Sequence, residues 1–212
     1  MQVCILRAQG RDKSRSYKNQ KTYMKPIAAL VMLLLFFSAP VPARDVGGVN
    51  VPDSLTLQSE KNSLVLNGAG YRKKFFIKVY VGALYLAQPM TQAEAVLGAS
   101  SARAMLMYFV HEVGTEKLAS AWKEGVFANS ATAEAQNYQS RIDQLNGMMR
   151  DMKPNDALRL EMPANGETRV FINDTLRGSV MGADFQRALL RVWLGPEPAD
   201  ASLKRALLGE KD

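Results

Sequence analysis

An arginine and a tyrosine in one short stretch are the side chains of this sequence best suited to holding a small anionic or carbonyl-containing ligand. Arg72 follows two glycines, Gly68 and Gly70, which allow a tight, positive-φ or closely packed turn. A guanidinium held on such a backbone can present its fork to a carboxylate, phenolate or carbonyl oxygen. The competing interpretation is a solvated cation that begins the run Arg72–Lys74 and protects a sheet edge, and on these residues alone that interpretation is favoured.

Tyr80 adds a hydroxyl on the same side of an extended chain as Arg72. Eight residues of a straight strand span about 26 Å, which is too far for both side chains to touch one small ligand. The two can therefore act together only if the chain turns or bulges between them. Tyr108, in a later β-type run, is a further candidate ligand contact, although tyrosines in such places are more often core or rim aromatics.

The sequence lacks the residues that several other kinds of site need. The only histidine is His111 and the only cysteine is Cys4, so we expect no Ser-His-Asp triad, no Cys-His pair and no His/Cys metal site. His111, beside Glu112 at a predicted strand end, is typical of a surface or hydrogen-bonded structural residue. The pair Gly68 and Gly70 lacks the third glycine of a dinucleotide fingerprint, and no phosphate-binding Gly-Lys-Ser/Thr is present. No cofactor is predicted.

Residues 24–43 have the organisation of a secretory signal. Lys25 gives a positive start, residues 27–37 form an unbroken apolar run, and small residues precede Arg44. The apolar run is about half as long as the roughly 20 residues of a membrane-spanning helix, so cleavage is favoured over a retained anchor. We expect an upstream extension at residues 1–23, either not translated, with Met24 as the true start, or lengthening the signal.

Residues 44–212 are then one exported domain, periplasmic if the host is a Gram-negative bacterium, with no integral membrane segment after cleavage. This domain keeps 20 Lys and Arg against 19 Asp and Glu, a net charge of +1, whereas the whole chain carries +7. The basic balance therefore belongs mostly to the leader, and no nucleic-acid partner is predicted. The only cysteine also lies in the leader, so no disulfide is expected.

Apolar periodicity predicts the elements that position Arg72 and Tyr80. The stretch from Gly68 to Leu86 is expected to be one central β-rich run, with Phe75, Ile77 and the alternate residues after them on its core face. Residues 44–50 are expected to be a loose lead-in. Further strands are predicted around 55–57, 64–66, 102–110, 158–162, 168–173 and 175–180. Helices are predicted from a capping box at Thr91 to Leu97, over 115–127, over 138–152, over 185–193 and over 200–208.

The last three predicted strands are separated by short turn sequences, so they should form an antiparallel meander. Strands and helices are segregated along the chain and do not alternate as in βαβ units. The fold class is therefore α+β, with a mainly antiparallel sheet covered on one side by helices.

The segment Gly68–Arg72, followed by Lys74-Phe75 and the run Val79–Leu86, resembles the chalcone isomerase superfamily, and most closely its bacterial exported branch of chalcone isomerase-like proteins. The resemblance extends from Val51-Pro52 to the end of the chain. It implies an open-faced β-sandwich of the chalcone isomerase type, in which a large antiparallel sheet carries a layer of helices and a ligand cleft lies between them.

In the plant enzymes of this family, the resemblance implies, an arginine at the position of Arg72 holds a phenolate that adds within the same molecule to an unsaturated ketone. Tyr80 falls at the position of a threonine that helps to hold a water at the developing enolate. The catalytic tyrosine has no counterpart here, because the segment where it should lie reads Gly114-Thr115-Glu116-Lys117-Leu118. Non-catalytic relatives bind fatty acids, with the motif arginine and a tyrosine on the carboxylate, and Arg72 with Tyr80 suits that role better.

We therefore expect a non-catalytic binder of a fatty acid or similar amphipathic ligand, with Arg72, Tyr80 and Tyr108 as ligand contacts. The alternative is an isomerase of the intramolecular lyase class, acting on a phenolic or enone substrate with Arg72 as its catalytic residue. A third hypothesis is a structural envelope protein with a closed core, which is favoured if side chains fill the cleft. The oligomeric state stays open.

Overall fold

The computed structural model describes residues 43–57 and 63–210. The expected upstream extension (residues 1–23) and signal peptide (residues 24–43) lie outside the described residues, except for Ala43, which begins the first strand. Within the described part of the chain, no helix is long and apolar enough to cross a membrane.

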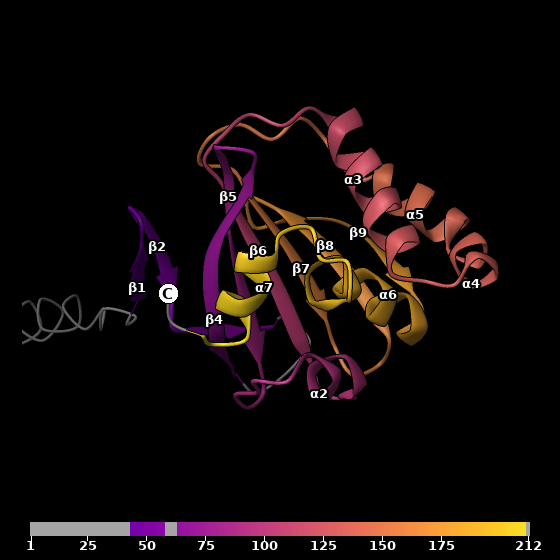
Figure 1. Cartoon of the computed structure of the whole chain (residues 1–212), viewed down its shortest axis with the longest axis horizontal. Coiled ribbons are helices and arrows are strands. Elements are labelled where there is room, and N and C mark those ends of the chain that lie inside the picture. The colour runs from indigo at the N-terminus through magenta and orange to yellow at the C-terminus, as the bar shows by residue number, and fades with distance from the viewer. Residues whose placement is uncertain (1–42, 58–62, 211–212) are drawn as a thin grey trace, which may run out of the picture. The chain divides into compact units, whose positions relative to one another are not determined.

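A single antiparallel sheet of seven strands organises the fold, with the strand order β3-β4-β5-β6-β7-β8-β9 (Figure 1). Its strands are β3 (Ser54–Thr56), β4 (Ser63–Lys74), β5 (Ile77–Leu86), β6 (Arg103–Phe109), β7 (Ala157–Met162), β8 (Glu167–Ile172) and β9 (Thr175–Met181). Strands that are consecutive in the sequence are neighbours in the sheet, and the longest connection, from β6 to β7, carries three helices. The predicted meander of the last three strands is confirmed.

Helices cover one face of the sheet, and a small hairpin lies against the other (Figure 1). The helices are α2 (Ala93–Gly98), α3 (Thr115–Ala128), α4 (Thr132–Asn137), α5 (Gln139–Asn146), α6 (Ala183–Leu194) and α7 (Ala201–Leu207). The hairpin pairs β1 (Ala43–Val46) with β2 (Val49–Pro52). The α+β class is confirmed, with one antiparallel sheet covered on one face by helices.

The core has a large part under the helices and a smaller part under the β1–β2 hairpin. Strand β5 serves both, because Tyr80 and Leu84 pack into the helical side while Val81 and Tyr85 pack into the hairpin side. Burial on both faces explains why the apolar run of β5 is almost continuous rather than alternating. The segment predicted to be a loose lead-in is in fact the β1–β2 hairpin, turned at Gly47 and Gly48 with positive φ.

The prediction of one central run from Gly68 to Leu86 is wrong, because the chain reverses at Phe75-Phe76 and forms two paired strands. Periodicity did not reveal this turn, since neither loop residue is one that a tight turn usually selects. Phe75 and Ile77 were expected on the core face, but both are exposed at the hairpin tip.

Two helices also differ from their predictions. The helix expected over 138–152 is shorter, because α5 ends at Asn146, and the short helix α4 that precedes it was not predicted. Met149 and Met152 are nevertheless buried, so the apolar spacing reported burial correctly but not helix. The capping box at Thr91 is absent, because α2 begins after Gln92 without a side-chain cap.

Candidate functional site

The β4–β5 hairpin places Arg72 and Tyr80 side by side. The two residues are direct partners across the strand pair, and the Arg72 Cζ lies 5.8 Å from the centre of the Tyr80 ring. A bulge follows, because the register shifts between Arg72 and Lys73 and leaves Val79 as an extra residue. Bulges re-aim neighbouring side chains, and here both Val79 and Tyr80 join the core on the helical side. The sequence required a turn or a bulge between Arg72 and Tyr80, and the structure has a turn at Phe75-Phe76 and a bulge at Val79.

Gly68 and Gly70 serve a close packing contact and not a turn. Both lie inside β4, and α7 crosses them so closely that a Cβ on Gly70 would be 2.6 Å from the Ala206 Cβ, while one on Gly68 would collide with the Ala206 carbonyl oxygen. Gly82 on β5 continues this strip, beneath Leu203 of α7. The sequence allowed these glycines a tight turn, a positive φ or close packing, and the structure shows close packing.

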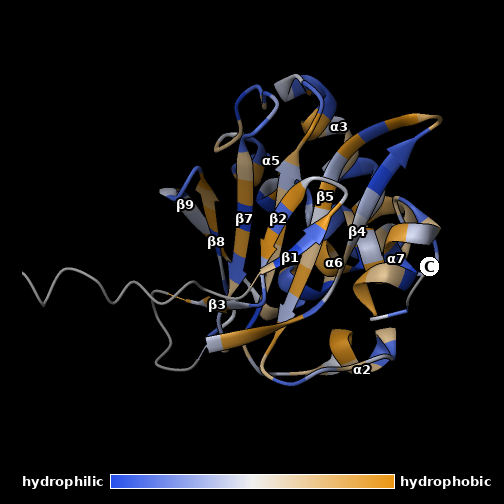
Figure 2. Cartoon of the chain, turned by 90° about the vertical axis from the view of Figure 1, so that its left-hand side faces the viewer, coloured by the Kyte–Doolittle hydropathy of each residue, from blue (hydrophilic) through white to orange (hydrophobic). Residues whose placement is uncertain are grey.

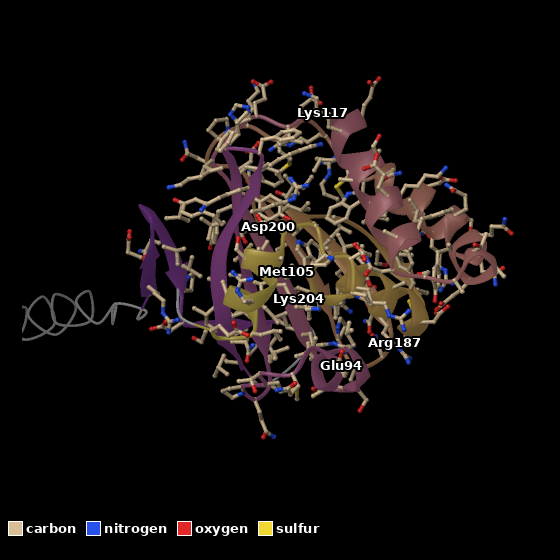
Figure 3. All side chains as sticks on the ribbon, viewed as in Figure 1. Glu94, Met105, Lys117, Arg187, Asp200 and Lys204 are labelled. Carbon is tan, nitrogen blue, oxygen red and sulfur yellow. The ribbon has the colours of Figure 1, made fainter. Side chains whose placement is uncertain are left out.

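One carboxylate ties α7 to the strand end that carries Arg72. Asp200 caps the helix with Oδ1, which accepts from the backbone N–H groups of Ser202 and Leu203. Its Oδ2 accepts from the backbone N–H of Lys73 at 2.7 Å. These hydrogen bonds hold the pKa of Asp200 below its usual value, against the effect of partial burial. The cap of α7 therefore fixes the backbone beside Arg72. Asp200 is labelled in Figure 3.

Tyr80 is buried, and its hydroxyl oxygen accepts a hydrogen bond of 2.8 Å from Nε1 of Trp193 on α6. Burial raises the pKa of Tyr80 to about 12, although the nearby Arg72 charge and the Trp193 hydrogen bond act in the opposite direction. The phenol is therefore neutral at physiological pH and keeps its hydrogen. No described residue accepts that hydrogen, so it is available to an oxygen of a ligand.

Arg72 is half-buried and forms no ion pair with any carboxylate of the described residues. Arg72 and Tyr80 together therefore present a fixed positive charge and a neutral hydroxyl donor, side by side, at the boundary between sheet and helices. This arrangement suits one anionic oxygen-bearing group, such as a carboxylate or phenolate.

Apolar side chains fill the layer beneath this pair. The Tyr80 ring lies 5.6 Å from Phe109, and Trp193 lies 5.6 Å from Trp122, centre to centre. Five buried methionines belong to the same core: Met105, Met107, Met149, Met152 and Met162. Met105 covers Gly82, since its Cε would be 2.9 Å from a Cβ placed there (Figure 3 labels Met105).

Cavities are found elsewhere in the described residues. One of about 430 Å³ lies between β4, the end of α7 and Arg44, and one of about 130 Å³ lies beside Arg103 and Arg187. Neither is lined by Arg72 or Tyr80. The site is thus a polar pair above a buried, methionine-rich core.

The structure does not bring Tyr108 to this pair. Tyr108 is opposite Val81 in the sheet and packs with the core under the β1–β2 hairpin, on the face away from Tyr80. His111 is exposed, and its described hydrogen bond is a backbone one to Val79. Among the described residues, no group of histidines, cysteines or carboxylates could hold a metal ion.

Sequence reasoning missed two residues of the site. Trp193 was seen only as an apolar position of a helix, and nothing in the sequence links it to Tyr80 across 113 residues. Asp200 stands where a helix cap is expected, directly before α7, so its capping role was readable. Its bond to Lys73 follows only from the way α7 crosses β4.

The fold and the site together define a class: an antiparallel sheet with helices on one face and an arginine–tyrosine pair where the two layers meet. The chain belongs to the chalcone isomerase-like family, whose sequence profile matches residues 43–209. Its structure is similar to the crystal structure of a fatty-acid binding protein from Arabidopsis thaliana, with a TM-score of 0.58 and 18% sequence identity. The similarity covers 76% of this chain and 92% of the plant protein. No curated protein matches this chain in sequence.

Proposed function

We propose that this protein binds a fatty acid or a similar amphipathic carboxylate without transforming it. The observation that carries the proposal is the pair of unused donors at the sheet edge, the Arg72 guanidinium without a described carboxylate partner and the Tyr80 hydroxyl with a free hydrogen. A carboxylate can accept from both, and charge-assisted bonds of this kind are the strong ones.

The apolar tail would enter the core beneath the pair. The side chains of this core are buried, so a tail that enters it has to replace some of their contacts with one another. Methionine is the residue best able to move aside, because its side chain is unbranched and adapts to irregular spaces. The five buried methionines of the core that contains Trp193 and Tyr80 support such an opening. The plant neighbour, a fatty-acid binding protein of the same fold, adds support.

Titration with dodecanoate tests the proposal. Arg72→Ala should weaken binding by about tenfold or more, because a hydrogen bond to a charged group contributes about 1.5–3 kcal/mol. Arg177→Ala is the matched control, since Arg177 is an exposed arginine on β9, at the opposite edge of the sheet, and should leave the affinity unchanged. Equal affinities for Arg72→Ala and the parent would contradict the role of Arg72.

Less supports the isomerase alternative. Thr115, in the segment where the family's catalytic tyrosine would stand, donates its hydroxyl hydrogen to Asp151 and begins α3. A second hydroxyl beside Arg72 is therefore not supplied from this segment. Incubation with a panel of chalcones distinguishes the two hypotheses. Turnover that is lost in Arg72→Ala would support the isomerase and contradict the non-catalytic binder.

We also propose that the protein is exported and that the signal is removed before Arg44, which leaves the domain in the periplasm of a Gram-negative host. The family match begins at residue 43, next to this position. N-terminal sequencing of the protein from its native host tests the proposal, and a chain that starts well before residue 44 would contradict it.

A further inference from the structure

The tip of the β4–β5 hairpin exposes three large apolar side chains in succession. Phe75, Phe76 and Ile77 are 86%, 101% and 51% exposed. Figure 2 shows this loop in orange at the end of the hairpin, beside the blue end of β4. Single exposed apolar residues are common on protein surfaces, but three together on a projecting loop form a patch that indicates an interaction.

Turn chemistry does not explain these residues. Two-residue hairpin loops select Asn, Asp or Gly because they require positive φ. The β8–β9 hairpin of the same chain follows this rule with Asn173 and Asp174, both at positive φ. The β4–β5 loop instead has Phe75 at a φ of 56°, a conformation that bulky residues rarely adopt. The two phenylalanines therefore serve neither the turn nor the core.

Positive charge surrounds the apolar tip. Lys73, Lys74 and Lys78 flank it and are exposed, and the hairpin carries no acidic residue between Arg72 and Tyr80. Two carboxylates lie near the base of the hairpin: Glu112 in the adjacent loop, which donates backbone hydrogen bonds to Val79, and Asp200, which accepts from the backbone N–H of Lys73. The three lysines still outnumber them. An apolar tip flanked by lysines is complementary to the surface of an anionic bilayer. The aromatic rings can enter the boundary between headgroups and acyl chains, while the ammonium groups reach the phosphates.

We infer that the β4–β5 hairpin docks this protein on an anionic lipid bilayer. Arg72 lies three residues from Phe75, about 10 Å along an extended strand. Docking therefore brings the Arg72–Tyr80 pair close to the depth of the headgroups, where the carboxylate of a membrane-dissolved fatty acid lies. Loading of the site from the bilayer rests on the proposed function, whereas docking itself does not.

Co-sedimentation with vesicles tests the inference. The probes are vesicles of mixed phosphatidylglycerol and phosphatidylcholine, and vesicles of phosphatidylcholine alone. The protein should sediment with the anionic vesicles, and high salt should weaken this binding. The variant F75N/F76G should bind at least about tenfold more weakly, which is about 1.4 kcal/mol. It should also remain folded, because asparagine adopts the positive φ of Phe75 more readily than phenylalanine does, and glycine tolerates any φ at position 76.

Leu176→Ser is the matched control, because Leu176 on β9 is 53% exposed but lies at the opposite edge of the sheet. It should bind vesicles as the parent does. Equal vesicle binding by the parent and F75N/F76G would overturn the inference, and so would a parent protein that stays in the supernatant. Self-association of the parent that disappears in F75N/F76G would overturn it too, by assigning the tip to a second copy of this chain.

Titration with soluble dodecanoate separates this inference from the proposed function. F75N/F76G should bind dodecanoate as tightly as the parent, since both phenylalanines lie outside the Arg72–Tyr80 pair. A parent that binds vesicles but not dodecanoate would contradict the proposed function and leave docking intact. A parent that binds dodecanoate but not vesicles would do the reverse.

Discussion

Three side chains of the candidate site contact one another in sequence, Trp193 with Tyr80 and Tyr80 with Arg72. Trp193 donates to the Tyr80 oxygen, which leaves the Tyr80 hydrogen to point elsewhere. Arg72 lies over the Tyr80 ring and attracts anions to the same place. Burial keeps the phenol neutral, so Tyr80 is a donor and never a competing anion beside the ligand.

The raised pKa of Tyr80 makes the stability of the fold depend on alkaline pH. Its pKa of about 12 in the folded protein exceeds its ordinary value of 10.0. The unfolded chain therefore binds fewer protons between these values, so Tyr80 lowers the free energy of unfolding as the pH rises from 10 towards 12. Urea unfolding at pH about 9 and about 11.5 should show this loss, and Tyr80→Phe should make it smaller. Parallel losses in parent and variant would contradict the assignment.

The sequence predicted two of these three residues. Arg72 was predicted from its place after Gly68 and Gly70, and Tyr80 from its hydroxyl on the same side of an extended chain; the resemblance implied a shared ligand. Their partnership depended on a reversal of the chain that periodicity did not show, because Phe75 and Phe76 read as strand residues. Trp193 could not be found, since an apolar helix position says nothing about which hydroxyl its ring nitrogen will meet.

At the scale of elements, the strip of glycines under α7 decides where the site lies. Gly68, Gly70 and Gly82 let the helix approach the sheet closely, and Asp200 then reaches Lys73. Asn67 secures the far end, because its amide nitrogen donates to the carbonyl of Leu207. The glycines and Arg72 are therefore structurally linked. The glycines let α7 pack against the sheet, and Asp200 at the start of α7 then holds the backbone of Lys73, next to Arg72.

Gly68→Ala should therefore destabilise the protein through α7. The added methyl group would collide with the Ala206 carbonyl, a backbone atom that cannot move without shifting the helix. Overpacking of this kind typically costs about 1–3 kcal/mol, which urea unfolding measures. Gly98→Ala is the control, because nothing lies within 4 Å of a Cβ at that position. Equal stabilities of the two variants would show that α7 adapts to the methyl group.

The sequence was most informative where an element has one apolar face and a clear end. Helix α6 is an example, because it buries Phe185 and Leu189 and ends at Gly195 as predicted. It was least informative where burial continues without regular structure, as at Met149 and Met152. Apolar spacing reports which side chains are buried, and a break such as Gly147 decides whether the backbone stays helical.

At the scale of the whole domain, the polar pair lies above a core of buried side chains. A ligand that enters such a core must replace contacts between side chains with contacts to its own tail. The net binding free energy from the tail is only the difference between these two sets of contacts. This predicts that the carboxylate, held by Arg72 and Tyr80 outside the apolar layer, contributes much of the specificity. This prediction also distinguishes the binding hypothesis from the structural one. A structural protein whose core never opens should show no change in stability with any ligand.

Thermal unfolding with and without ligand tests this prediction. Dodecanoate at about 100 times its dissociation constant should stabilise the fold by about 2.7 kcal/mol. For a domain of this size, that corresponds to a rise of roughly 5–10 °C in the melting temperature. The methyl ester of dodecanoate keeps the tail but lacks the charge, so its effect should be smaller, and Arg72→Ala should reduce the difference between acid and ester. Equal shifts by acid and ester in the parent would mean that the carboxylate is not recognised, and no shift with either would favour the structural hypothesis.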